Sequence, residues 1–157
     1  MIQYKRTEGG RQLMYKLSYT DVSTASNKGI RAEQNADFLF MGEVNAKHDN
    51  VPYNMGSDIK ALHISVKSSR FTLASGKAMQ AQDFEGQLTE YMANTVSTQV
   101  CYMAMNMVAY VMNMAEFEAF VRTFCTLQKD SSKNGGKYKI RCKHESRKMI
   151  AWLEAHI

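Results

Sequence analysis

One short stretch near the middle of the chain alternates strictly between apolar and polar residues. Residues 62–67 have the sequence Leu-His-Ile-Ser-Val-Lys. Because successive side chains of a β-strand point to opposite faces, this pattern predicts a strand whose apolar residues enter the core. The same alternation is expected to turn His63, Ser65 and Lys67 toward a cleft. A loop rich in Asn, Asp, Pro and Gly, residues 45–57, precedes the strand.

Periodicity along the rest of the chain predicts the other elements. Apolar residues three and four positions apart indicate helices, and the clearest one begins after Asn113, with Glu116 at position N3 of a capping box. Two β-rich runs predict a hairpin that turns near Asn106. We expect helices over residues 28–41, 81–93, 114–127 and 146–156, and further strands over residues 12–19, 98–103, 107–112 and 137–142.

This order of elements predicts a single domain of the α/β (mixed α+β) class. A helix, a central mixed sheet and several covering helices together form three layers. The chain of 157 residues is long enough to bury a core without disulfides, and it contains no internal repeat or proline-rich linker. We therefore treat residues 1–157 as one unit.

Positive charge is concentrated toward the C-terminus. The chain has a formal net charge of +5, yet residues 129–148 alone contain eight basic and two acidic residues. The segment 129–157 is therefore basic and the remainder is close to neutral. Such a surface favours an anionic partner, although it can also be an ordinary solvated face. The candidate phosphate contacts are Lys133, Lys137, Lys139, Arg141, Lys143 and Arg70.

Cysteine, histidine and hydropathy patterns argue against several other classes. The three cysteines form no CxxC pair and the four histidines are scattered, which disfavours a structural zinc site. The most apolar run, Val100 to Met114, is interrupted by Asn106 and Asn113. It is shorter than the roughly 20 residues of a membrane helix. An odd cysteine count without a secretory signal predicts a cytoplasmic protein with no membrane partner.

An acidic residue at a glycine-marked turn precedes the alternating strand. Asp58 follows Gly56-Ser57, and Lys67 comes nine positions after it. This layout is typical of hairpins that bind a metal and hydrolyse phosphodiesters. Mg²⁺ prefers oxygen ligands, so Asp58 and the main-chain carbonyl of Val66 are the expected ligands. We expect Lys67 to orient water or neutralise the transition state, and Ser65 to hydrogen-bond a ligand or water.

These residues resemble the motifs of the PD-(D/E)XK nuclease superfamily, which includes many restriction endonucleases. The matching segments are Gly56-Ser57-Asp58, Ser65-Val66-Lys67 and the polar tail Ser68-Ser69-Arg70. The resemblance covers roughly residues 28–127 and implies a restriction-endonuclease-like three-layer fold. It also implies a Mg²⁺ cofactor, for which Mn²⁺ can substitute, and a double-stranded DNA substrate. A homodimer that cuts both strands is a further implication.

Ser65 stands where most members of that superfamily have an acid. One branch of restriction endonucleases is similar in having a serine there and taking a carboxylate from the following helix. Glu85 is the matching candidate for this metal ligand, with Asp83 and Glu90 as alternatives. The resemblance also assigns a catalytic role to a glutamate of the preceding helix, for which Glu33 is the candidate.

Two other functions agree with the same residues. A nuclease-like domain that lost its activity with the acid at position 65 would bind DNA through its basic segment without cutting it. In a protein-interaction domain, Asp58 would be an ordinary turn residue and Lys67 a solvated strand residue. The first alternative predicts salt-sensitive DNA binding without cleavage. The second predicts no salt-sensitive DNA binding and no cleavage.

Overall fold

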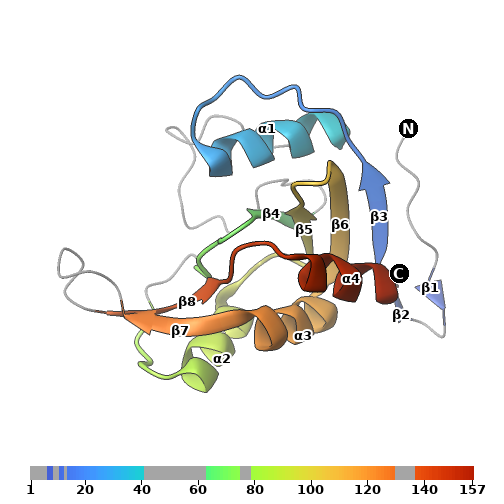
Figure 1. The fold of residues 1–157 in the computed structure, drawn as a ribbon. Helices are drawn as coiled ribbons and strands as arrows, with labels where there is room; N and C mark the ends of the chain where they lie inside the picture. Colours follow the sequence, from blue (N-terminus) through green and yellow to red (C-terminus); the bar gives the residue numbers. More distant parts are fainter. Residues whose placement is uncertain (1–6, 9–10, 13, 41–62, 75–78, 130–136) are drawn as a thin grey trace.

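A mixed four-stranded sheet forms the centre of the protein (Figure 1). This computed structural model describes residues 7–8, 11–12, 14–40, 63–74, 79–129 and 137–157. The strands lie in the order β3 (Tyr15–Ser18), β6 (Val108–Asn113), β5 (Gln99–Met103) and β4 (Ile64–Ser68). β3, β6 and β5 are antiparallel neighbours, whereas β4 and β5 are parallel.

Within the described residues, four helices cover the two faces of this sheet. α1 (Lys28–Leu39) lies on one side, and α2 (Phe84–Asn94), α3 (Met114–Phe124) and α4 (Arg147–Ala155) lie on the other (Figure 1). α2 connects β4 to β5, as expected because parallel strands need a crossover connection. The structure therefore confirms the predicted mixed α+β class and its three layers.

Each helix begins at a polar residue whose side chain accepts a hydrogen bond from the first turn. The N-caps are Asn27, Asp83, Asn113 and Ser146. At α3 the bonds are reciprocal, because Glu116 in turn accepts from the backbone N–H of Asn113 at 3.0 Å. This is the predicted capping box, which satisfies backbone donors that a helix N-terminus leaves without partners.

Two hydrophobic clusters hold the layers together. The larger one joins the sheet to α2, α3 and α4 through aromatic residues that include Tyr102, Phe117 and Phe120. The smaller one joins the other face to α1, whose small residues Ala32 and Ala36 allow close approach to the sheet. Because both faces of the sheet are covered, β4 and β5 are almost entirely buried.

A second small sheet extends the domain beside the main one. β7 (Cys125–Lys129) pairs antiparallel with β8 (Tyr138–Cys142). β8 also bonds to the segment that follows β4, because Leu73 N–H donates to Ile140 and Cys142 N–H donates to Phe71, each at 2.8 Å. A short hairpin, β1 (Thr7–Glu8) and β2 (Arg11–Gln12), lies near the N-terminus.

The sequence predictions fail locally at two places. Leu127, predicted on the buried stripe of the third helix, lies in β7, because α3 ends at Phe124 and the backbone of Cys125 is extended. Antiparallel pairing with β8, the next strand along the chain, overrides the helical period there. His63 does not belong to the alternating strand: it lies before β4 in a left-handed conformation with φ of 53°.

Candidate functional site

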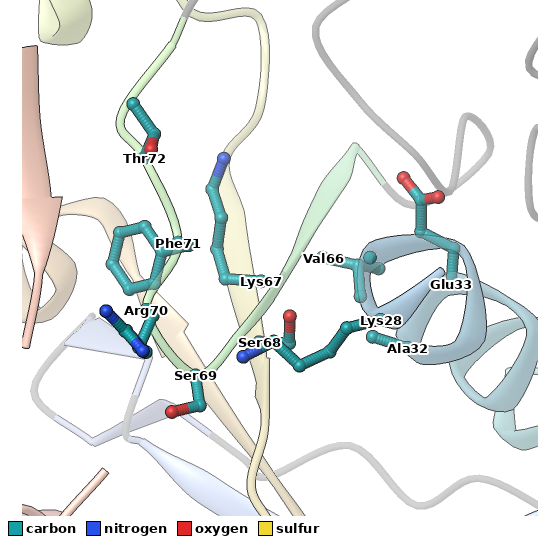
Figure 2. A pocket seen from close by; sticks show the side chains of 11 residues that line it. Lys28, Ala32, Glu33, Val66, Lys67, Ser68, Ser69, Arg70, Phe71 and Thr72 are labelled. Atoms are coloured by element: carbon teal, nitrogen blue, oxygen red, sulfur yellow. The ribbon is translucent and has the colours of Figure 1, made fainter. Parts of the chain in front are cut away.

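A cavity of about 280 Å³ opens where β4 ends beside the N-terminal half of α1 (Figure 2). β4 and the turn after it form one wall, and α1 forms the other. In Figure 2, Lys28 reaches from α1 toward the β4 turn, and Lys67 lies on the β4 wall. The lining residues are Lys28, Gly29, Ala32, Glu33, Val66, Lys67, Ser68, Ser69, Arg70, Phe71 and Thr72.

This cavity unites several residues that the sequence predicted separately. Glu33 comes from α1, Val66 and Lys67 from β4, and Arg70 from the turn. With Lys28, three basic residues and one acidic residue line it, and the ammonium group of Lys67 points away from α1, toward Phe71 and Tyr91. Such a surplus of positive charge favours an anionic ligand. Lys28 was not predicted, because nothing in the local sequence indicates that the start of α1 meets the end of β4.

Two aromatic rings flank the ammonium group of Lys67. Its Nζ lies 5.9 Å from the ring centroid of Phe71 and 5.9 Å from that of Tyr91. Both rings are buried, and contacts of this kind attract a cation electrostatically. Lys67 is therefore a half-buried lysine with a defined position rather than a freely solvated strand residue. Tyr91 belongs to α2, so only the tertiary structure brings it to this lysine.

The turn after β4 holds an arginine in an unfavourable backbone conformation. Phe71 N–H donates to the carbonyl of Ser68 at 3.1 Å, and Arg70 has φ of 64°. A positive φ at the third residue of a four-residue turn is the type II pattern, which normally requires glycine. An L-residue there costs about 1 kcal/mol, and such residues occur preferentially at functional sites. The exposed Arg70 side chain lines the cavity nonetheless.

Three of the residues that line the cavity carry oxygen atoms that suit a hard cation. Glu33 offers a carboxylate, Val66 a carbonyl group and Ser68 a hydroxyl group, all of which are oxygen ligands of the kind Mg²⁺ prefers. Within the described residues no group of three His, Cys, Asp or Glu could hold a metal. Asp58, the predicted anchoring ligand, lies outside the described residues, as does the predicted phosphate contact Lys133.

Glu85 is not part of this cavity. Its two carboxylate oxygens pair with the guanidinium of Arg122 on α3, with Nη2 3.0 Å from Oε2. This hydrogen bonding lowers the pKa of Glu85. The alternatives also have structural partners: Asp83 caps α2, and Glu90 accepts from the backbone N–H of Gln80 at 2.8 Å. Thus none of these three α2 carboxylates lines the cavity that contains Lys67.

Ser65 is buried rather than turned toward a cleft. Only 4% of its surface is exposed, and it lies opposite Val100 of β5, a member of the larger hydrophobic cluster. The prediction of an open face was wrong because α2 and α3 cover that side of the sheet. Ser65 does not line the cavity, whereas Val66 and Lys67 do.

The basic C-terminal strand lies beside the cavity. Arg141 forms an antiparallel bridge with Thr72, which lines the cavity. Ile140 and Cys142 are buried, so alternation along β8 turns Lys139 and Arg141 away from the core. The described cations predicted as phosphate contacts, Lys137, Lys139, Arg141 and Lys143, therefore follow one strand that adjoins the cavity.

A second cavity, of about 170 Å³, continues from the first. The two share Lys28, Ala32, Ser68 and Ser69 as lining residues. The second also reaches Tyr19, Asp21, Arg31 and the turn between β5 and β6. Together they form a groove along the carboxyl ends of β4 and β5, and we call it the strand-end groove.

No family model, curated protein or solved structure matches the chain. Among the described helices, none has the length and apolar character needed to cross a membrane.

Proposed function

We propose that the protein is a metal-dependent endonuclease that hydrolyses phosphodiester bonds in double-stranded DNA. The observation that carries this proposal is the cavity at the end of β4, whose lining residues include Glu33, Lys67 and Arg70. They come from two separate parts of the sequence, α1 and the end of β4 with its turn, and were predicted for catalysis (Glu33 and Lys67) and for phosphate binding (Arg70). The basic strand β8 next to this cavity supports a polyanionic substrate.

The chemistry of the cavity agrees with phosphoryl transfer. The reaction develops negative charge on the phosphoryl oxygens, and preorganised cations stabilise that charge. Lys67, positioned by Phe71 and Tyr91, is suited to this role. Asp58, Glu33 and the Val66 carbonyl are the candidate ligands of Mg²⁺, which when bound supplies an activated water and further charge neutralisation. Glu85 is not among these candidate ligands, because its carboxylate is paired with the guanidinium group of Arg122.

Supercoiled plasmid incubated with Mg²⁺, Mn²⁺ or EDTA tests the proposal. We expect nicked and linear products with either metal and none with EDTA. Lys67→Met and Glu33→Gln should each lower the cleavage rate by about a hundredfold or more, the usual cost of losing a charge-stabilising group. Asp58→Ala should also abolish cleavage. Asp37→Asn is the matched control, because Asp37 lies one turn after Glu33 on α1 but does not line the cavity.

Two results would contradict the proposed nuclease activity. One is the absence of cleavage of any DNA by the wild-type protein with either metal. The other is cleavage that Lys67→Met and Asp37→Asn reduce equally, since this would locate the activity elsewhere. Circular dichroism of each variant shows whether it is folded.

A DNA-binding module without nuclease activity is the second candidate. It is favoured by the replacement of the usual acid with Ser65, and by the engagement of Asp83, Glu85 and Glu90 in structural contacts. Such a protein would bind duplex DNA in EDTA with steep salt dependence and never cut it. The homodimer stays a prediction under either function.

A further inference from the structure

The turn between β5 and β6 exposes two methionines at the end of the strand-end groove. Met105 is 63% exposed and Met107 is 38% exposed, and both line the second cavity. Met105 therefore keeps most of its surface in contact with water. Because this tip lies beside a cavity lined by Lys28 and Arg31, it suits a ligand that offers both an apolar surface and negative charge.

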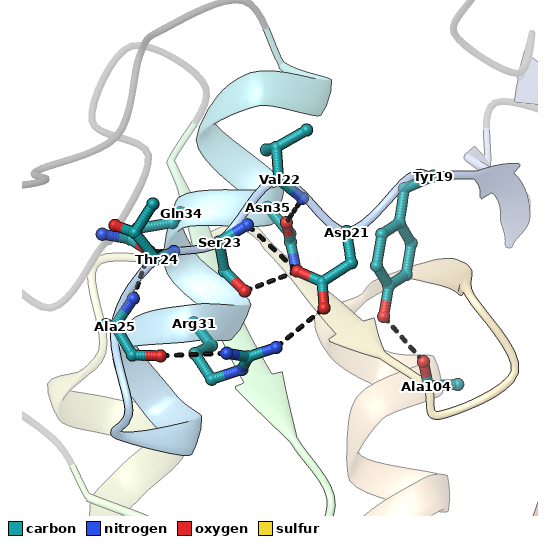
Figure 3. A network of polar contacts seen from close by, with 10 residues as sticks. All are labelled: Tyr19, Asp21, Val22, Ser23, Thr24, Ala25, Arg31, Gln34, Asn35 and Ala104. Atoms are coloured by element: carbon teal, nitrogen blue, oxygen red, sulfur yellow. Dashed lines mark hydrogen bonds and ion pairs between the residues drawn. The ribbon is translucent and has the colours of Figure 1, made fainter.

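This turn is held rigidly although its methionines are exposed. The Met105 N–H donates to both carboxylate oxygens of Glu145, each at 3.1 Å. From the other side the Tyr19 hydroxyl donates to the Ala104 carbonyl at 2.8 Å (Figure 3). The Tyr19 N–H donates to the Met107 carbonyl at 3.0 Å. A ligand would thus meet a preformed apolar projection, which reduces the entropic cost of binding.

Met107 occupies a backbone conformation that normally belongs to glycine. Its φ is 65°, and its N–H donates to the Ala104 carbonyl at 3.3 Å. In three-residue hairpin loops a residue after a type I turn takes this left-handed conformation, usually as glycine. Arg70 and Met107, two residues with positive φ, therefore lie along the same groove. Retaining side chains at both positions in spite of strain suggests that both side chains are used.

Cations lie between these two strained residues. Lys28 lines both cavities. Arg31 lines the second and is oriented by two partners, with Nη2 2.7 Å from Asp21 and Nη1 3.0 Å from the carbonyl of Ala25 (Figure 3). Lys28 and the methionine tip thus lie along the same groove, so that an anionic backbone and an apolar surface can be contacted side by side.

We propose that Met105 and Met107 form a wedge that enters duplex DNA at a base step next to the phosphate held in the first cavity. The proposal rests on the DNA substrate of the proposed function. Methionine is one of the apolar side chains that proteins insert between base pairs to unstack and bend a duplex. Lys28 would contact the phosphate backbone next to the wedge. A bend of this kind would open the groove of the DNA toward the β4 cavity.

Fluorescence of 2-aminopurine tests the wedge in EDTA, where cleavage does not occur. A short duplex carries this base at each position in turn, and affinity is measured by anisotropy across a salt series. Wild type should raise the fluorescence at one or two adjacent positions, because unstacking relieves quenching. Met105→Ala should abolish this rise and weaken binding about tenfold, as expected for the loss of a buried methionine contact. The salt dependence of DNA binding by Met105→Ala should equal that of wild type, since the substitution removes no charge.

Two further variants separate the wedge from charge and from folding. Lys28→Ala should lower the slope of log K against log salt by about one, because one phosphate contact is lost. It should leave the rise in 2-aminopurine fluorescence unchanged. Val96→Ala is the matched apolar control, because Val96 is 55% exposed and does not line the groove. It should behave as wild type.

The possible outcomes distinguish this inference from the proposed function. DNA binding with a fluorescence rise but without cleavage in Mg²⁺ supports the wedge and refutes the nuclease. Cleavage by wild type, with Met105→Ala equal to Val96→Ala in both affinity and fluorescence, overturns the wedge and leaves the nuclease intact. Absence of any DNA binding overturns both, and the methionine tip would then be a contact for a protein partner.

Discussion

At the scale of single residues, the cavity depends on side chains whose positions are set by unusual local environments. Lys67 is held beside two aromatic rings, and Arg70 keeps its side chain at the cost of a left-handed backbone. Neither arrangement is needed to make the fold, because glycine would satisfy the turn and a smaller residue would complete the strand. Substitutions at these two positions should therefore impair function without a matching loss of stability.

Substitution of Arg70 by glycine should strengthen the fold and weaken DNA binding. Glycine removes about 1 kcal/mol of backbone strain, partly offset by the greater entropy of the unfolded chain. We expect the free energy of unfolding in urea to rise by about 0.5 kcal/mol. The same variant should lose affinity for duplex DNA, because one cation of the cavity is absent.

Arg70→Ala is the control for this prediction. It removes the same charge but keeps an L-residue at φ of 64°, so it should lose the same DNA affinity without gaining stability. If Arg70→Gly were less stable than Arg70→Ala, the turn would not be strained as inferred.

At the scale of elements, a polar clamp attaches the segment before α1 to the helix itself. Asp21 accepts from the N–H and hydroxyl of Ser23, from the Asn35 amide at 3.1 Å and from Arg31 (Figure 3). The Ser23 hydroxyl and backbone bonds are the main reasons that the pKa of Asp21 is lowered to about 2 from its ordinary 3.8. Asn35 also accepts from the Val22 N–H at 2.8 Å, so the segment and helix form one wall of the groove.

The Asp21 clamp should make stability depend on acid. Because the folded state lowers this pKa, the carboxylate contributes fully above about pH 3.8 and loses its contribution as the pH falls toward 2. Asp21→Asn should therefore melt at a lower temperature than wild type at neutral pH, and the difference should shrink between pH 4 and pH 2. Thermal unfolding followed by circular dichroism measures both. A difference that stays constant over that range would show that the charge of Asp21 is not involved.

At the scale of the whole molecule, three structural units meet at the cavity. β4 supplies Lys67, α1 supplies Lys28 and Glu33, and β8 runs beside the turn through the bridge between Thr72 and Arg141. The basic strand β8 therefore adjoins the cavity. The phosphate backbone of a duplex bound at the cavity would continue along β8.

Charge removal on β8 should reduce the salt dependence of DNA binding. Each phosphate contact contributes about 0.9 to the slope of log K against log salt, so Arg141→Gln with Lys143→Gln should lower it by about two. Affinity should fall for all duplex sequences alike, because phosphate contacts carry no sequence information. Lys16→Gln is the control: Lys16 pairs with Glu154 at 2.6 Å on another part of the molecule and should leave the slope unchanged. Equal slopes for all three proteins would exclude β8 from the DNA interface.

Local patterns in the sequence were enough to predict most elements, and they placed in advance three residues that line one cavity. The period of two marked β4, and the capping box at Asn113 and Glu116 marked the start of α3, because these signals depend only on neighbours along the chain. Lys67, Glu33 and Arg70 were recognised by residue type and order. β7 was missed, since the apolar period of α3 continues to Leu127 and does not show that the backbone becomes extended at Cys125.

The sequence by itself determined the class of the fold, its helices and most of its strands, and the concentration of positive charge in residues 129–148. Only the tertiary structure decided which charged groups share one cavity. Burial on both sides of the sheet withdrew Ser65 into the core, and a partner on α3 engaged Glu85. The reason is physical: periodicity follows the geometry of one element, whereas the position of a side chain in a site depends on the elements that pack against it.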